Sequence, residues 1–480
     1  MQKTNIAGNL NSNETALTSP VASWWDRRLL APVIAAAVMR FALLAISLVQ
    51  NGSRVLFQAD TVSYLDPGRN LLLHGRFIAD GVPDLVRTPG YALFLGLTSL
   101  AGLPFAGAVN AVVSVFTIVL VWRLARALFL DDRVAIAAAW IFVFEPISVA
   151  FSSTLLSETL FLVPFLICME RLVTFLRSYD LRLLVTAGLS LAIATYIRPI
   201  SYYLPVLIAM GLIAALARVP EIRWKAPAIL LLSALPWLAL WQVRNRVETG
   251  YSGFSSISDI NLYFYDAAGI EARLKHEAFF DLRRELGYVD FSDRDGQSYI
   301  YQPYLALHPE QASWTQGQRL TYMHAEGLQV IKAHIGIYFQ NVRSALISAI
   351  FSPGSGYLYR LVVRGGSQSN PALIDEGTAS GGIQLVRKSP WEATEKIVFE
   401  AALLAAYVLA ILGIVQALRG RFKGSFNIAS LWLILGVSTY LLCVAAMSDT
   451  AADSRLRMPV MPFICIFMAA SIWRTKRAST

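Results

Sequence analysis

Residues 104–122 read Pro-Phe-Ala-Gly-Ala-Val-Asn-Ala-Val-Val-Ser-Val-Phe-Thr-Ile-Val-Leu-Val-Trp, and none of them carries a charge. A helix needs about 20 mainly apolar residues to cross the hydrocarbon core of a bilayer. The stretch therefore predicts a membrane-spanning helix. The whole chain agrees with it, because only 15% of the residues are charged, whereas a soluble globular chain carries roughly 25%.

The same criterion places ten spans along the chain, so we expect an all-α polytopic membrane protein. The spans lie near 29–50, 104–128, 133–152, 157–177, 182–197, 200–217, 226–243, 394–418, 427–447 and 457–474. The net charge of +9 would indicate a nucleic-acid partner only if the basic residues formed a polar face. They stand instead in short clusters between apolar runs, as in membrane proteins, so we expect no nucleic-acid partner.

Basic residues also indicate how the chain is oriented. Every connection on one side of the predicted bundle contains Lys or Arg, which the positive-inside tendency assigns to the cytoplasm. Among these residues are Arg28, Arg126, Arg133, Arg177, Arg182, Arg223, Arg419 and Arg421. We therefore expect a multi-pass protein of the inner or plasma membrane, with its remaining loops on the extracytoplasmic face.

The predicted spans divide the chain into four parts. Residues 1–28 are polar without the apolar core of a signal peptide, which indicates a disordered cytoplasmic tail. Residues 29–243 form a transmembrane module that includes an extracytoplasmic loop at 51–90. A hydrophilic extracytoplasmic insert follows at 244–393, and 394–480 contains the last transmembrane helices. No internal repeat is visible, which weakens the case for an inverted-repeat transporter.

Two acidic residues are expected at the outer face, each beside an apolar run. Asp60 precedes a segment whose spacing predicts a short helix at the membrane surface, and Glu158 opens the span near 157–177. Each has a structural alternative, because Asp caps helices well and an acid in a first helical turn is favoured by the helix dipole. Glu145 stands before Pro146 inside an apolar segment, where charge is costly, and we assign it no role.

Several arginines are expected on the same outer side, against the positive-inside tendency. They are Arg54, Arg69, Arg76, Arg87, Arg198, Arg244, Arg246, Arg455 and Arg457. The planar fork of arginine matches phosphate oxygens in two-point contacts, although contact with lipid headgroups is the ordinary alternative. Arg198, between two apolar runs, is the leading phosphate ligand. Arg40 lies within a span, so we expect it to be paired inside the bundle.

Acids and arginines on one membrane face suit group transfer from a lipid phosphate. A glycosyl phosphate already has a good leaving group, so the site needs cations to stabilise the departing phosphate. It also needs a carboxylate that takes the proton of the attacking hydroxyl. Signatures of other chemistries are missing from the sequence, which has no phosphate-binding Gly-rich loop, no His-Glu-x-x-His and no Gly-x-Ser-x-Gly. The three cysteines show no paired spacing.

At these residues the chain resembles the GT-C glycosyltransferase superfamily. The resemblance is to the branch that contains protein O-mannosyltransferases, lipid A aminoarabinose transferases and bacterial lipopolysaccharide-core transferases. The stretches that carry it are Asp60-x3-Tyr64 with Leu71-Leu72 and Gly75, Arg87-Thr-Pro-Gly-Tyr91, Leu156-Ser-Glu-Thr-Leu160, Arg198-Pro199 and, more weakly, Arg455-Leu-Arg-Met-Pro459.

The resemblance implies a GT-C-like bundle and transfer, with inversion, from a polyprenyl-phosphate sugar to a membrane lipid, polysaccharide or protein. It implies Asp60 as the base, Glu158 as a second acid, and a divalent metal ion on these two acids as the cofactor that the family allows. The residues expected around the donor phosphate are Arg198, Arg87, Arg455, Arg457 and Tyr64. Two alternatives stay open: an oligosaccharide ligase or polymerase that uses a diphosphate-linked glycan, and a transporter or flippase for a lipid-linked sugar.

Overall fold

The computed structural model describes residues 26–58, 60–288, 302–363, 390–422, 424, 426–448 and 454–472. The expected tail at 1–28 therefore lies almost wholly outside the described residues, as does part of the expected insert. The described chain is helical apart from a two-stranded antiparallel hairpin, in which β1 (Ile78–Ala79) pairs with β2 (Val82–Pro83). This agrees with the all-α fold class that the sequence predicts.

Long apolar helices make up most of the bundle. Within the described residues, seven helices are long and apolar enough to span a membrane, and an eighth span is a bent pair. The seven are η1 with α1 (Arg27–Asn51), α4 (Leu103–Phe129), α7 (Ser157–Ser178), α10 with α11 (Pro220–Thr249), Lys396–Leu418 of α20 (Pro390–Leu418), Ile428–Met447 of α21 (Ile428–Ser448), and η9 with α22 (Ser454–Ile472). The weakest expected spans are shorter apolar helices, α8 (Arg182–Ile197) and α9 (Leu204–Ala215).

The bent pair is α5 (Asp132–Val143) and α6 (Pro146–Ser152), which differ in direction by 59°. Proline has no N–H and forces the preceding residue out of helical geometry, so the span expected at 133–152 breaks at Glu145, which has extended backbone. The break frees backbone groups that must find partners inside the bundle. Glu145 accepts hydrogen bonds from the N–H groups of Ile147 and Ser148, and Arg40 donates to the carbonyl of Val143.

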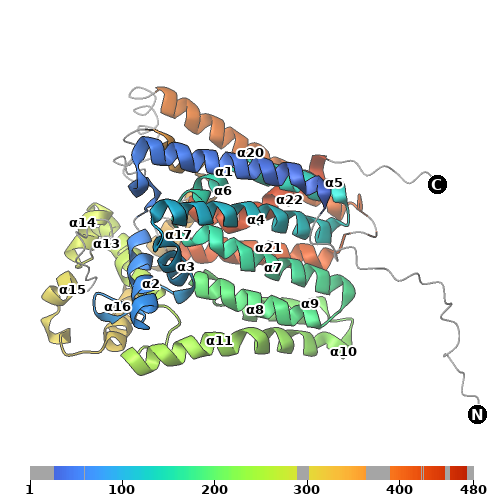
Figure 1. Ribbon diagram of the computed structural model, residues 1–480. Coiled ribbons are helices and arrows are strands. Elements are labelled where there is room, and N and C mark those ends of the chain that lie inside the picture. The colour runs from blue at the N-terminus through green and yellow to red at the C-terminus, as the bar shows by residue number, and fades with distance from the viewer. Residues whose placement is uncertain are drawn as a thin grey trace, which may run out of the picture.

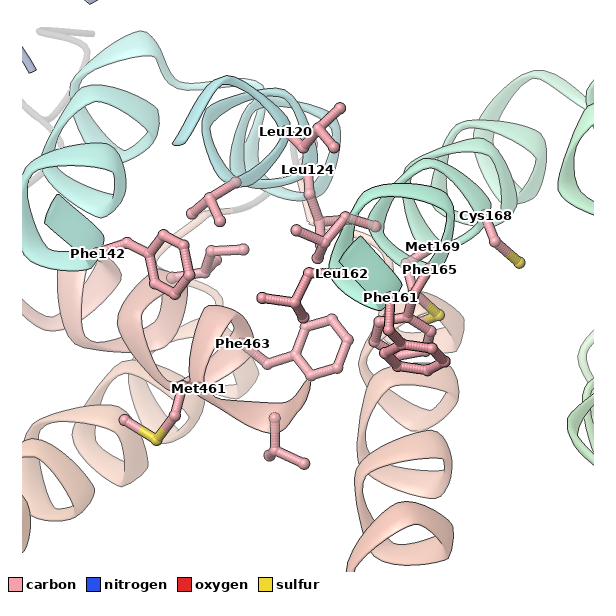
Figure 2. Packing of buried hydrophobic residues seen from close by; sticks show 14 of the residues in the cluster. Leu120, Leu124, Phe142, Phe161, Leu162, Phe165, Cys168, Met169, Met461 and Phe463 are labelled. Atoms are coloured by element: carbon pink, nitrogen blue, oxygen red, sulfur yellow. The ribbon is translucent and has the colours of Figure 1, made fainter. Parts of the chain in front are cut away.

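Helices α4 and α7 form the centre of the bundle. In their most apolar windows 61% and 72% of the residues are buried, against 22% for the α20 window and 28% for the window that includes α11. The last two helices therefore present most of their surface outward, where lipid solvates apolar side chains. Figure 2 shows the central packing, in which Leu124 of α4 and Phe165 of α7 lie near Phe463 of α22.

The shorter elements gather at one end of the bundle, and α10 lies at the other end (Figure 1). The first of them are η2 (Ser53–Leu56), α2 (Thr61–His74), β1, β2 and α3 (Pro89–Ser99). Helices α2 and α3 cross closely at Gly68, where any side chain would collide with the carbonyl of Ala92. The expected surface helix after Asp60 is thus present as α2 and rests against the bundle.

The remaining elements of this end come from the expected insert and the chain around it. They are α12 (Ile257–Asn261), the π-helical η4 (Leu262–Ala267), α13 (Ala268–Lys275), α14 (Phe279–Glu285), α15 (Gln302–Leu307), η6 (Pro309–Gln311), α16 (Gln316–Ala333), α17 (Ile335–Phe351) and α18 (Ser355–Val362). Helix α17 differs from the expectation of a hydrophilic insert, because it is apolar and packs against α21 and η9.

Candidate active site

Asp60 lies immediately before α2 and forms two ion pairs with arginines. Its Oδ1 is 2.7 Å from Nη2 of Arg87, and its Oδ2 is 2.8 Å from Nη2 of Arg455. The side chain makes no capping hydrogen bond to α2, although its position is that of the N-cap. Helix capping therefore does not account for this carboxylate.

Glu158 lies in the first turn of α7 and is 1% exposed. Its Oε1 is 2.5 Å from Nη1 of Arg198 and 2.7 Å from Nε of Arg455. Its Oε2 has no hydrogen-bond partner among the described residues. A buried carboxylate oxygen without a partner is costly, and the ion pairs of Oε1 with Arg198 and Arg455 offset part of that cost.

Arg455 joins the two acids. Its Nη2 holds Asp60 and its Nε holds Glu158, although 395 residues of sequence separate Arg455 from Asp60. The segment that carries it, η9 (Ser454–Val460), is the start of the last predicted span. Asp60, Glu158, Arg87, Arg198 and Arg455 thus form one cluster, which we call the acid–arginine cluster.

The backbone around the two acids is tied together by hydrogen bonds. The Nδ2 atom of Asn110, within α4, lies 2.9–3.1 Å from the carbonyl oxygens of Phe151, Ser152 and Thr154, which shape the turn that leads to α7. The hydroxyl of Thr61, next to Asp60, donates to the carbonyl of Leu155 at 2.9 Å. These contacts hold the two acids in register, and the sequence motifs did not indicate Asn110.

Tyr64 and Ser63 contact Arg87, and Ser157 contacts Tyr64. The guanidinium of Arg87 lies over the Tyr64 ring at 4.5 Å, and its Nε donates to Ser63 Oγ at 2.7 Å. The Tyr64 hydroxyl lies 3.4 Å from Ser157 Oγ. Tyr64 therefore stands between Arg87 and the start of α7, close to the cluster, as its motif suggested. The serines were not singled out from the sequence, because serine is too common in loops to give a signal.

The charges of the cluster favour an anion. Burial by itself would raise the pKa of Asp60, but Arg87 and Arg455 together hold that pKa well below its ordinary value. Three guanidinium groups stand against two carboxylates, which leaves one net positive charge at this point. A phosphate group is the natural counterpart of such a cluster.

The same charges do not fit a divalent metal ion. Within the described residues no group of three or more His, Cys, Asp and Glu side chains could hold one. A cation at Asp60 or Glu158 would also stand beside three arginines, each within ion-pair distance of one of these acids. The metal that the family resemblance allowed therefore has no suitable ligand set here, and we derive no step through it.

Arg457 lies outside the cluster. Its Nη1 donates to the carbonyls of Ala349 and Ile350 at 2.8 and 2.6 Å, and its Nη2 donates to the carbonyl of Ser352 at 2.9 Å. The side chain is buried and holds the C-terminal end of α17. The expected site residues that the structure brings together are Asp60, Glu158, Arg87, Arg198, Arg455 and Tyr64. Arg457 instead forms hydrogen bonds with the backbone at the end of α17.

The fold and this cluster define an α-helical multi-pass membrane protein with a buried charged site where η9, α2, α7 and α8 meet at one end of the bundle. No protein-family model matches the sequence, and no curated protein matches it. Solved structures that the chain matches are 12–13% identical to it, with TM-scores below 0.5.

One of these structures is the archaeal oligosaccharyltransferase AglB from Archaeoglobus fulgidus, in complex with an inhibitory peptide and a dolichol-phosphate. It is 12% identical, with a TM-score of 0.47, over 92% of this chain and 50% of AglB. Another is ArnT from Cupriavidus metallidurans bound to undecaprenyl phosphate, 13% identical, with a TM-score of 0.37, over 92% of this chain and 77% of ArnT. The chain spans about half the length of AglB.

Proposed function

We propose that this protein is a glycosyltransferase of the membrane that transfers a sugar, with inversion, from a polyprenyl-phosphate donor to an extracytoplasmic acceptor. The observation that supports it most is Arg455, which holds Asp60 and Glu158 at 2.8 and 2.7 Å and gathers a proton acceptor and phosphate ligands at one point. The motif resemblance to GT-C enzymes also supports it, because the motifs that carry the resemblance contain these same residues.

Direct displacement needs few protein groups. The acceptor hydroxyl oxygen forms a bond to the anomeric carbon of the sugar, while the bond from that carbon to the phosphate oxygen breaks on the opposite side. The hydroxyl proton passes to Asp60, and the electron pair of the broken bond leaves with the polyprenyl phosphate. Arg198, Arg87 and Arg455 stabilise that charge. Glu158 positions Arg198 and Arg455, and its Oε2 accepts from a substrate hydroxyl.

The decisive experiment is sugar transfer by the purified protein. Labelled polyprenyl-phosphate sugars are offered together with membrane lipids, glycans and peptides as acceptors. Asp60→Asn keeps the size of the side chain but removes the base, so we expect at least about a 100-fold loss of transfer. The matched control is Asp66→Asn on α2, where the carboxylate accepts from Asn70 and from the backbone of Asp80, and transfer should persist.

Each other outcome points to a different function. Transfer only from a diphosphate-linked glycan, or transfer that survives Asp60→Asn, would replace the proposal by an oligosaccharide ligase or polymerase. Movement of a lipid-linked sugar across liposomes without transfer would replace it by a flippase. A product that retains the anomeric configuration of the donor would contradict single displacement.

The membrane face of the site is tested by labelling. Arg76 is exposed between α2 and β1, at the end of the bundle that contains the acid–arginine cluster, and Glu221 of α10 (Pro220–Arg223) is exposed at the other end. We expect Arg76→Cys to react with an impermeant thiol reagent from outside intact cells and Glu221→Cys to react only after permeabilisation. Both are made in a Cys443→Ser background, because Cys443 is exposed. The reverse pattern would place the site in the cytoplasm.

A further inference from the structure

Arg455 differs from the other two arginines of the cluster in how many acids it binds. Arg87 is paired with Asp60 and Arg198 with Glu158, whereas Arg455 is paired with both. Each acid therefore has a second arginine beside it. If Arg455 moved away, neither Asp60 nor Glu158 would be left as a buried charge without a partner, which is the costly case.

Arg455 is also the most exposed member of the three. Its side chain is 27% exposed, against 9% for Arg87 and 10% for Arg198. An incoming anion therefore reaches Arg455 more easily than the other two. Arg87 also contacts the Tyr64 ring and Ser63.

The two oxygens of Asp60 show why this matters for catalysis. In this arrangement Oδ1 is occupied by Arg87 and Oδ2 by Arg455. A carboxylate whose oxygens both receive charged hydrogen bonds is a weak proton acceptor. A base in this position needs one oxygen turned toward the acceptor hydroxyl, and Oδ2 is the one whose partner is more exposed.

We propose that Arg455 exchanges partners during donor binding: it bridges Asp60 and Glu158 in the empty site and moves to the phosphate of the lipid-linked donor, which releases Asp60 to act as the base. The inference rests on the proposed function for the identity of that donor. It adds an order of events, because the base becomes available only after the donor phosphate has bound.

Formal charge supports this exchange. The cluster has one net positive charge, from three arginines and two acids. A sugar linked to a polyprenol through phosphate is a diester with one negative charge, so the complex is neutral. After transfer the proton rests on Asp60 and the leaving polyprenyl phosphate is a monoester with up to two negative charges, so the site is neutral again. Among the five side chains of the cluster and the lipid phosphate, no step leaves an uncompensated charge, which would be expensive in this partly buried place.

The exchange is tested by lipid binding, without sugar transfer. The probe is a polyprenyl monophosphate in detergent micelles, titrated at fixed salt against the wild type, Asp60→Asn, Arg455→Gln and the double variant. We expect Asp60→Asn to bind about tenfold tighter than the wild type, equivalent to 1.4 kcal/mol, because Arg455 is no longer held by Asp60. In the Arg455→Gln background the same change should gain less than about threefold.

The double variant separates the exchange from simple charge removal. Deleting a negative charge near an anion raises affinity in any background, so an equal gain with and without Arg455 would overturn the proposal. So would Asp60→Asn binding no more tightly than the wild type. Asp66→Asn should leave the affinity unchanged, and melting temperatures confirm that every variant is folded.

Two further arms identify the ligand and separate this inference from the proposed function. Inorganic phosphate should not compete at concentrations near the lipid affinity, and equal binding with the same dependence on Arg455 would overturn the assignment to a lipid donor. If the gain from Asp60→Asn depends on Arg455 but the protein transfers no sugar, the partner exchange stands and the proposed glycosyltransferase activity is contradicted. If the protein transfers sugar but the gain from Asp60→Asn does not depend on Arg455, the activity stands and the partner exchange is contradicted.

Discussion

Two of the groups of buried charges in the described part of the bundle differ in what their charged atoms bind. In the acid–arginine cluster the charges bind each other, as Asp60 does with Arg87 and Arg455. At the break between α5 and α6 the charges bind the backbone and hydroxyl groups: Glu145 accepts from two N–H groups, and Arg40 donates to Ser114, Ser148 and the carbonyl of Val143.

The difference shows how a structural charge is told from one available to a ligand. A charge that completes the bonding of a helix end is fixed by the fold, because its removal leaves backbone groups unsatisfied. A charge paired to other charges can exchange partners when a further ion arrives. Burial alone does not make this distinction, since Arg40 is 0% exposed and Glu158 is 1% exposed.

The largest expected effect on stability separates two residues of one short segment, Arg455 and Arg457. Arg457→Gln removes the donor of the Ala349 and Ser352 carbonyls at the end of α17, so we expect a loss of about 3 kcal/mol of unfolding free energy. Arg455→Gln should change stability by less than about 1 kcal/mol, because Asp60 and Glu158 each keep an arginine. Melting temperatures in detergent measure both.

Affinity for polyprenyl phosphate should show the opposite order. Arg455→Gln should weaken binding, whereas the folded fraction of Arg457→Gln should bind like the wild type. Equal stability losses in the two variants would show that Arg455 is as structural as Arg457, and the distinction between the two groups of charges would fail there.

The sequence placed both arginines in one motif and gave them one role, and local geometry explains why the structure separates them. The segment η9 is a 3-10 helix, which has three residues per turn. Residues i and i+2 therefore point about 120° apart, toward different neighbours. An α-helix would separate the two side chains as well, because residues i and i+2 do not face each other there. A motif read along the chain shows neither direction nor neighbour.

Most of the remaining cluster was predictable, because chain order and the alternation of spans put Asp60, Glu158 and Arg198 on one face. The pairing of residues was not predictable. Arg455 meets Asp60 across 395 positions of sequence, and nothing local records which helix ends become neighbours. The break at Glu145 was also missed, although Pro146 was visible, because the apolar pattern resumes directly after Glu145 and Pro146 and runs on to 152.

Asp84 combines features of both groups of charges. Asp84 accepts from the backbone N–H of Val86 at 2.8 Å, as a structural acid does, yet it stands near Arg87 and Arg244. Burial raises the pKa of Asp84 to about 6, although the backbone N–H groups of Val86 and Arg87 and the two arginines oppose the rise. Between pH 4 and 6 the folded chain therefore keeps a proton that the unfolded chain releases, so this carboxyl lowers stability as pH rises through that window.

We expect Asp84→Asn to remove that penalty, since an amide keeps the acceptor and cannot ionise. The variant should be more stable than the wild type by about 3 kcal/mol at pH 8 and nearly equal to it at pH 4. Melting temperatures across this range measure the difference. A constant difference at all pH values would mean that Asp84 does not titrate between pH 4 and 6. Asp84 would then belong with the acids that bind the backbone, such as Glu145.

The smallest expected effect concerns Arg198, the arginine that the sequence marked first. Arg198→Lys keeps the charge but replaces a planar fork by a single point donor, so we expect polyprenyl-phosphate affinity to fall about tenfold or less, with little change in stability. Arg244→Lys is the matched control, because Arg244 lies at the same end but its ion pair is with Glu248, outside the acid–arginine cluster, and it donates to the carbonyls of Asp84 and Phe77. If Arg244→Lys weakens binding as much as Arg198→Lys does, the affinity depends on the general positive field of this end and not on the arginines of the acid–arginine cluster. A loss confined to Arg198→Lys would show that the ligand recruits the arginines of that cluster.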